Sequence, residues 1–413
     1  MARRSRSATG GEPWLWLGAG VVALSLLVVF GILALLTWRG LGHFWPDPVV
    51  EIVHEDATGE RRVSLGTVVE RETRSGPDGT SEVRRLLLRT GNRDLDPPDF
   101  RWIEAGRIRE RRRPPDALVL ERTTWGRAHG YLEAFESDDG VLRRGAGARA
   151  AAAAGLERAR RLRQEIAELR RGRIADLSDE LEDRRRARRG LPAGAGADPQ
   201  RLRSLSGRIA ELEAAYDEAE TRLRRLEAEL ARDRIRLRLA DGSVHALPLG
   251  TVVRMWRPNT MHLGERVAFQ LRAVGAFLGE SPREANTGGG VFPAIFGTVL
   301  LVLLMAILVT PLGVVAAIYL HEYARDGLAV RTLRIAVNNL AGVPAIVYGV
   351  FGLGFFVYVV GGSIDALLFS DRLPSPTFGA PGLLWAALTL ALLTVPVVIV
   401  STEEGLARIP REI

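Results

Sequence analysis

The chain has 413 residues, a formal net charge of +7 and no cysteine. The missing cysteines exclude disulfides, thiolate nucleophiles and cysteine-ligated zinc sites. The chain also has no lysine, which excludes an ordinary Walker A site, because that loop needs a lysine to reach the β- and γ-phosphates of ATP. Any ATP that drives this protein must therefore bind another subunit.

Residues 14–38 form the first apolar run and carry no charged side chain. The run is long enough to cross a bilayer, and Trp14, Trp16 and Trp38 lie where interfacial aromatic residues belong. A cleaved signal peptide is the alternative, but the end of the run does not resemble a cleavage site. We expect an uncleaved transmembrane helix, preceded by a short N-terminus at residues 1–13.

Residues 39–290 combine two kinds of predicted structure. Strict alternation in RIRLRLADGSVHALPLGTVV (from Arg234) and a similar layout in VVEIVHEDATGERRVSLGTVV (from Val49) predict a small β module at about 45–145 and 234–257. The region at about 150–233 is typical of an antiparallel coiled-coil hairpin. Its second arm has an unbroken heptad seam, whereas the first slips by one residue at Ile174, where a strict heptad would place Arg173.

Three further apolar runs predict transmembrane helices at 291–320, 335–360 and 382–402. The fold class is thus an α-helical polytopic membrane protein with an inserted β module and coiled-coil hairpin. Arginines at the N-terminus and at 321–334 exceed those at 361–381, so the positive-inside rule places the first two segments in the cytoplasm. The large region at 39–290 and the loop at 361–381 are then outside. Prolines within the runs predict kinked, bundled helices, and Gly342, Gly349, Gly352 and Gly354 are expected to admit close neighbours.

No pattern in the chain predicts catalysis. The six histidines are scattered, and no pair of them has the spacing of metal ligands. No G-x-S-x-G or G-x-G-x-x-G follows a predicted strand. We expect no catalytic, metal-binding or cofactor-binding residue in this chain.

The C-terminal part resembles a known family. GGGVFPAIFGTVLLVLLMAILVTPLGVVAAIYLHEYA, NNLAGVPAIVYGVFGLGFF and LTLALLTVPVVIVSTEEGLARIPREI, all from Gly288 onward, look like the PstA permease of bacterial phosphate ABC importers. The resemblance covers three ordered motifs at family-like spacing. It implies a type I importer permease of the bacterial inner membrane, with six transmembrane helices in the full protein.

The resemblance also implies a coupling site for an ATPase at residues 403–413. The residues that it assigns to coupling are Glu403, Glu404, Gly405, Leu406, Ile409 and Pro410. The two glutamates are expected near the start of a coupling helix, where the macrodipole favours anions. Asn338, Asn339, Gly342 and Pro344 are candidates for the pathway or for helix packing.

The partners that the family implies are a PstC-type permease, a PstB-type ATPase dimer that holds ATP and Mg²⁺, and a periplasmic phosphate-binding protein. Membrane lipid is expected around the helices, and nucleic acid is not a partner, because the charges of the hairpin alternate in sign.

Two departures from the family stand out. The chain ends inside the coupling loop, before two more expected helices, so it is either a fragment or a protein that lacks these helices; we expect a fragment. The region at 39–290 is far longer than the short loop of ordinary members, and we expect it to be a docking platform for the binding protein or the cell envelope. The alternative is a mechanotransmission or envelope-regulatory protein that acts through its coiled coil without transporting a solute.

Overall fold

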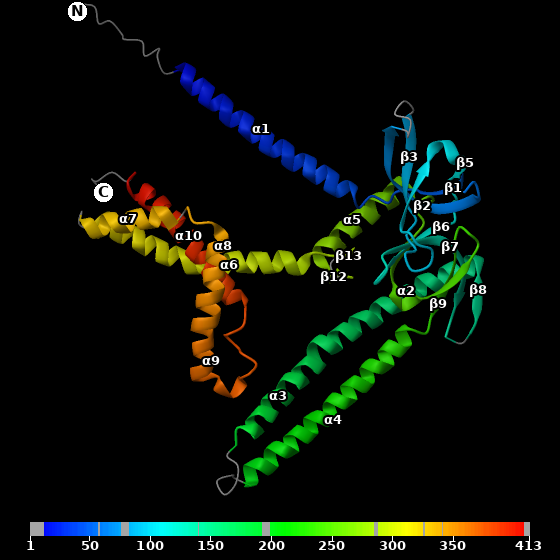
Figure 1. Ribbon diagram of the computed structural model, residues 1–413. Helices are drawn as coiled ribbons and strands as arrows, with labels where there is room; N and C mark the ends of the chain where they lie inside the picture. Colours follow the sequence, from blue (N-terminus) through cyan, green and yellow to red (C-terminus); the bar gives the residue numbers. More distant parts are fainter. Residues whose placement is uncertain are drawn as a thin grey trace, which may run out of the picture. The chain divides into compact units, whose positions relative to one another are not determined.

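The computed structural model describes residues 12–56, 58–75, 82–138, 140–191, 199–284, 288–324, 327–340 and 342–408. The chain divides into two compact units. One comprises Met1–Ala167 with Arg224–Val291, and the other comprises Glu168–Leu223 with Phe292–Ile413. Each unit is described by itself, and Figure 1 gives the element labels.

The first unit contains a sheet of five antiparallel strands in the order β4-β3-β2-β1-β5. Alternating apolar residues build it, and Val50, Ile52, Leu88 and Ile103 form its buried face. The strands are β1 (Val49–Glu55), β2 (Arg61–Ser75), β3 (Glu82–Arg89), β4 (Phe100–Glu104) and β5 (Ile108–Arg112), with a 3₁₀ turn, η1 (Ala105–Arg107), between the last two.

A second antiparallel sheet lies beside it in the same unit, with the order β10-β9-β7-β6-β11 and β8 paired to β7. Its buried face packs against the alanine-rich start of helix α2 (Gly145–Leu169), and Ala148 and Ala152 have no exposed surface. The strands are β6 (Ala117–Arg122), β7 (Arg127–Glu136), β8 (Leu142–Arg144), β9 (Arg234–Arg238), β10 (Val244–Pro248) and β11 (Val252–Trp256).

The repeated LGTVV pentapeptide has two different structures. Leu65–Val69 lies within strand β2. In the second copy, Leu249–Thr251 forms a 3₁₀ turn, η3, and β11 starts only at Val252. The preceding Pro248 ends strand β10, so the second copy turns a corner where the first continues straight. The two copies therefore belong to different sheets.

Helix α2 continues through a π-helical segment, η2 (Arg170–Ile174), into α3 (Ala175–Arg189), and α4 (Pro199–Leu230) returns beside α3 (Figure 1). Within the second unit, Leu177 and Leu181 of α3 pack against Ile209, Leu212 and Ala219 of α4. The π segment lies where the apolar seam slips by one residue. One extra residue in the turn returns Ile174 to the packed face.

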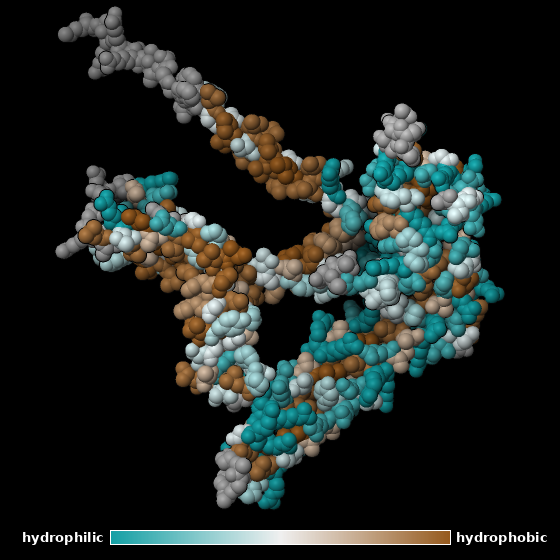
Figure 2. All heavy atoms as spheres, viewed as in Figure 1, coloured by the Kyte–Doolittle hydropathy of each residue, from teal (hydrophilic) through white to brown (hydrophobic). Residues whose placement is uncertain are grey.

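Four helices are long and apolar enough to cross a membrane: Trp16–Gly42, Phe292–Tyr323, Ala345–Leu368 and Leu383–Leu406. The first belongs to α1 (Glu12–Gly42), whose described side chains are exposed along its length, and Figure 2 shows its apolar surface in brown. The second comprises α6 (Phe292–Ile318) and the π segment η4 (Tyr319–Tyr323). The last is α10 (Leu383–Leu406).

The third span differs from its predicted bounds of 335–360. Residues 328–340 form a separate helix, α7 (Leu328–Leu340), so most of the segment expected to be a loop at 321–334 is helical. The span itself comprises α8 (Ala345–Phe351), the π segment η5 (Gly352–Gly361) and α9 (Gly362–Leu368). Pro344 is extended, and its ring leaves no N–H for a preceding turn, which separates α7 from α8. A short 3₁₀ turn, η6 (Ser370–Arg372), follows.

Helix α5 (Leu263–Gly279) leads from β11 toward α6 and is preceded by a capping box, in which His262 and Glu265 satisfy each other's backbone N–H groups. Phe269 of α5 packs against Trp256. Gln270 Nε2 donates to the carbonyl oxygen of Leu41 at the end of α1 (2.9 Å). A two-stranded ladder of β12 (Pro282–Arg283) and β13 (Gly288–Gly289) precedes α6.

Candidate functional site

The predicted coupling residues lie at the C-terminal end of α10. Glu403, Glu404, Gly405 and Leu406 occupy the last turns of this helix, while Ile409 and Pro410 lie outside the described residues. The expectation that the glutamates begin a new helix is wrong. They lie at the negative end of the α10 macrodipole, where a carboxylate is disfavoured unless a cation offsets it.

Arg334 of α7 supplies that cation. Its Nη2 lies 3.7 Å from Glu403 Oε1 and donates to the carbonyl oxygen of Leu320 (3.1 Å). The guanidinium thus joins α7 both to α10 and to the end of the second span. The apolar residues Ala317, Leu320 and Ile399 pack together in the same region.

The adjacent glutamates therefore have different environments. The Glu403 side chain is only 24% exposed, and its Oε1 is buried without a hydrogen bond. Glu404 and Gly405 are exposed, and Leu406 is half-buried. Glu403 is built into the helix bundle, whereas Glu404, Gly405 and part of Leu406 form a surface that another protein can contact.

The candidates for the pathway or for helix packing lie around the break between α7 and α8. Asn339 is exposed on α7, and the Asn338 side chain lies outside the described residues. A Cβ at Gly342 would meet only the carbonyl oxygen of Asn339, at 3.5 Å. No other described helix therefore packs closely at Gly342, and the expectation of a close neighbour there is wrong. Pro344 caps the start of α8.

Close helix contacts occur at two other glycines. A Cβ at Gly352 would lie 2.0 Å from Thr389 Oγ1 of α10, and a Cβ at Gly313 of α6 would lie 2.5 Å from Val398 Cγ1. The absent side chains let α10 approach both other spans, as small residues do in membrane proteins. The expectation for Gly352 is therefore confirmed. At Gly349 and Gly354, no described atom lies within 4 Å of an added Cβ.

Sequence reasoning missed an anchoring carboxylate at the other end of the bundle. Asp365 in α9 is buried and accepts hydrogen bonds from the backbone N–H groups of Phe378 (3.0 Å) and Gly379 (2.7 Å). Trp385 Nε1 donates to the carbonyl oxygen of Phe378 (2.7 Å). These bonds hold the segment between η6 and α10 against the helices. A lone aspartate at the end of an apolar run was the available signal.

Among the described residues, no group of histidine, aspartate and glutamate side chains has a metal-binding arrangement. The site therefore consists of an ion pair, close helix contacts and one exposed helix end. Such an arrangement can transmit movement between helices, because Arg334 connects three helical segments through a single side chain.

No family model matches the chain, and no solved structure matches it. Similarity to curated proteins covers about a third of it. A phosphate transport system permease protein PstA from Mycobacterium leprae is 35% identical over 125 residues, which are 30% of this chain and 35% of that protein. A PstA from Yersinia pestis is 34% identical over 141 residues, 33% of this chain and 41% of the relative.

A third relative carries a different permease name. A phosphate transport system permease protein PstC from Mesorhizobium japonicum is 29% identical over 130 residues, 29% of this chain and 39% of that protein. The chain thus spans less than half of the length of these relatives. With its four apolar helices it is a multi-pass membrane protein, and part of it is similar to PstA-type phosphate transport permeases.

Proposed function

We propose that this chain is a permease subunit of an ABC importer that moves inorganic phosphate across the inner membrane. The observation that carries the proposal is the identity of 34–35% to proteins named phosphate transport permease PstA. The packed bundle of three spans with a further apolar helix supports a polytopic permease rather than a single anchor.

Two features support the proposed partners: the chain has no lysine for ATP binding, and its spans have apolar outer faces. Without lysine it cannot form a Walker A loop, so a PstB-type ATPase dimer would hold ATP and Mg²⁺. The apolar outer faces of the spans support pairing with a PstC-type permease, the second kind of protein to which the chain is similar. A periplasmic phosphate-binding protein would deliver the substrate. The chain itself would be non-catalytic.

The exposed end of α10 is the proposed contact with the ATPase. Glu404 and Gly405 are accessible there, and Leu406 adds apolar surface. Glu403 has a different role in this proposal: through Arg334 it would pass a movement of α10 to α7 and the second span. This end of the bundle, the N-terminus and the segment around α7 would face the cytoplasm, because arginines concentrate there. The β module would then be periplasmic.

The helical hairpin is proposed to be an antiparallel coiled coil that serves as a docking platform. Its buried leucines recur at heptad spacing, and its outer faces carry arginine and glutamate in alternation, as in the pairs of Arg185 with Glu213 and Arg208 with Glu180. A long, charged, solvated hairpin suits a reversible contact with a binding protein or the envelope.

Uptake of micromolar phosphate in cells that lack the gene tests the proposal. The full-length reading frame should restore uptake. Glu404→Ala should lower uptake several-fold at unchanged membrane levels, because it alters only the proposed contact surface. Glu403→Ala should lower the amount of folded protein as well.

The matched control is Asp116→Ala, which removes another exposed carboxylate, 72% exposed and outside the three motifs. It should leave uptake unchanged. Normal uptake in the deletion strain would contradict the transport function and would favour a regulatory role for the region between α1 and α6. Full activity of Glu404→Ala would contradict the coupling role alone.

A further inference from the structure

An arginine-lined cavity lies within the first unit. Its volume is about 440 Å³. Strands β3, β6, β7 and β11, helix α5 and the β12–β13 ladder contribute to its wall, which includes Arg89, Arg127, Arg254 and Arg283. We call this cavity the arginine pocket.

Two of these arginines are already neutralised. The Glu121 carboxylate accepts hydrogen bonds from Arg254 Nε and Arg283 Nη2, both at 2.7 Å. Burial alone would raise the pKa of Glu121, but the hydrogen bond from Arg254 and the two positive charges outweigh it and lower that pKa. Arg283 also lies 3.4 Å from Glu280. Its Nε and Nη1 are nevertheless buried without a hydrogen-bond partner.

The other two arginines have no ion pair within the described part of the chain. The Arg89 guanidinium lies over the Phe100 ring, with its carbon 5.1 Å from the ring centroid, and that of Arg127 lies 5.8 Å from the Trp256 centroid. Burial, and next the charge of Arg89, lower the pKa of Arg127. Asp47 interacts with both cations but is not within ion-pair distance of either, and burial raises its pKa. The pocket therefore holds two arginines without an ion pair, beside unused N–H donors of Arg283; Asp99, Glu280 and Glu284 are further carboxylates in its wall.

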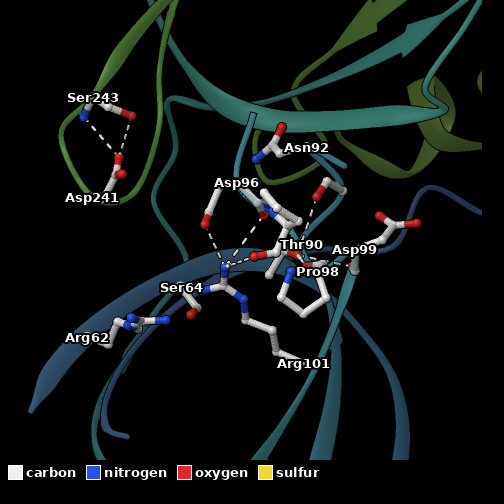
Figure 3. A network of polar contacts seen from close by, with 12 residues as sticks. Arg62, Ser64, Thr90, Asn92, Asp96, Pro98, Asp99, Arg101, Asp241 and Ser243 are labelled. Atoms are coloured by element: carbon white, nitrogen blue, oxygen red, sulfur yellow. Dashed lines mark hydrogen bonds and ion pairs between the residues drawn. The ribbon is translucent and has the colours of Figure 1, made fainter. Parts of the chain in front are cut away.

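The architecture keeps these groups in place. The loop between β3 and β4 is fixed by Thr90 Oγ1, which donates to the carbonyl oxygens of Pro98 (2.9 Å) and Asp99 (3.0 Å), and by the ion pair of Arg101 with Asp96 (2.7 Å), as Figure 3 shows. Across the pocket, the backbone N–H groups of Trp125 and Gly126 donate to Glu284, at 2.8 and 3.1 Å. The arginines are thus positioned before any ligand arrives.

We propose that the arginine pocket binds a phosphate group. Guanidinium N–H groups in a fixed fork match the oxygens of a tetrahedral oxyanion, and a phosphate charge near −2 would give Arg89 and Arg127 the ion-pair partner that they lack. The volume and the aromatic walls leave room for an organic substituent. Phe44, just after α1, and Phe277 of α5 also line the pocket, so the phosphate group can be free inorganic phosphate or the headgroup of a phospholipid.

The test uses the purified full chain. Titration calorimetry with inorganic phosphate in lipid-free detergent tests the free anion. Native mass spectrometry after incubation with phosphatidylglycerol or phosphatidylcholine tests the headgroup. We expect saturable binding in one of these arms and at least a tenfold weaker interaction for Arg89→Gln/Arg127→Gln. The matched control Arg236→Gln, which removes an exposed arginine paired with Glu136 outside the pocket, should bind as the unmodified chain does.

Thermal unfolding distinguishes a binding role from a purely structural one. Because Arg89 and Arg127 repel each other in the empty pocket, the double variant should unfold at the same or a higher temperature without ligand and should lose the rise that the ligand produces. Absence of binding in every arm, or equal binding by the double variant, would overturn the proposal. These readouts do not depend on transport, so they succeed or fail independently of the permease function.

Discussion

His129 connects the two sheets of the β module through buried polar contacts. Its side chain is almost fully buried, its backbone N–H donates to Asn92 Oδ1 (3.0 Å), and its Nδ1–H donates to the carbonyl oxygen of Thr90 (2.9 Å). Burial is the main reason that its pKa falls to about 4 from an ordinary value of 6.5. The folded module therefore holds a neutral imidazole at neutral pH.

This shift predicts acid-sensitive stability. Between pH 6.5 and about 4 the unfolded chain takes up a proton at His129, while the folded chain does not. The contribution of His129 to the free energy of unfolding is therefore fully present above pH 6.5. It decreases by about 3 kcal/mol as the pH falls from 6.5 to 4. Histidine NMR of the full chain should show one imidazole that titrates near pH 4, absent in His129→Gln.

The dependence of the free energy of unfolding on pH gives a second test of this prediction. His129→Gln should flatten the slope between pH 4 and 6.5, whatever it does to stability at pH 7. An imidazole of His129 that titrates near 6.5 in the folded protein would contradict the burial argument.

At the scale of residues, the sequence predicted which residues matter at the end of α10 but not which side chains lie next to them. The Thr-Glu-Glu run marked the right end of α10, yet only the helix phase shows that Glu403 faces Arg334 and Glu404 faces outward. The sequence did not predict the arginine pocket, because its four arginines come from segments as far apart in the chain as Arg89 and Arg283. No local pattern records such long-range proximity.

At the scale of elements, glycine contacts set the packing of the spans. Gly352→Ala should destabilise the solubilised protein by about 1 to 3 kcal/mol, because the new methyl group would overlap Thr389 of α10. Thermal unfolding in detergent measures the loss. Gly349→Ala and Gly354→Ala are matched controls, because no described atom lies within 4 Å of their added Cβ. Restoration by Gly352→Ala/Thr389→Ala would show that the overlap is the cause; an equal loss in the controls would contradict it.

The π segment η2 allows a second test on an element. Deleting Gly172 should convert Arg170–Ile174 into a regular α-helical turn and keep the apolar seam aligned, because the segment contains one residue more than the heptad needs. We expect unchanged or higher thermal stability and full helicity by circular dichroism. Deleting Glu165 shortens the helix equally but rotates Leu162 and Ala159 off the buried face. That control should unfold at a lower temperature, and equal stability of both deletions would contradict this account of the segment.

Periodicity predicted many elements well, and its failures have local causes. The one-residue slip at Ile174 was visible in the sequence and coincides with the π segment. The third span was misplaced because hydropathy alone joined α7 to α8 across Pro344. The two LGTVV copies diverged because Pro248 precedes only the second. In each case, a proline or an extra residue changed the local backbone in a way that the spacing of apolar side chains does not indicate.

At the scale of the whole molecule, the hairpin has a core separate from that of the β module. Leu177, Leu181, Ile209 and Leu212 share no contact cluster with Phe135, Ile235 and Leu249 of the second sheet. Replacing residues 170–222 with a short Gly-Ser turn should therefore leave the β module folded and the membrane helices inserted. The alanine-rich start of α2 stays on the sheet, held also by Arg163, which donates to the carbonyl oxygens of Gly250 (2.8 Å) and Val252 (2.9 Å).

This truncation separates the proposed functions of the two parts. If the hairpin is a docking platform, the truncated chain should keep phosphate binding at the arginine pocket but lose association with a binding protein or the envelope in co-purification from cells. Arg185→Ala/Arg208→Ala, which breaks two cross-helix ion pairs on the exposed face while leaving the leucine core, should weaken the same association more mildly. Unchanged association of the truncated chain would refute the platform, and a module that unfolds without the hairpin would refute the independence of the two cores.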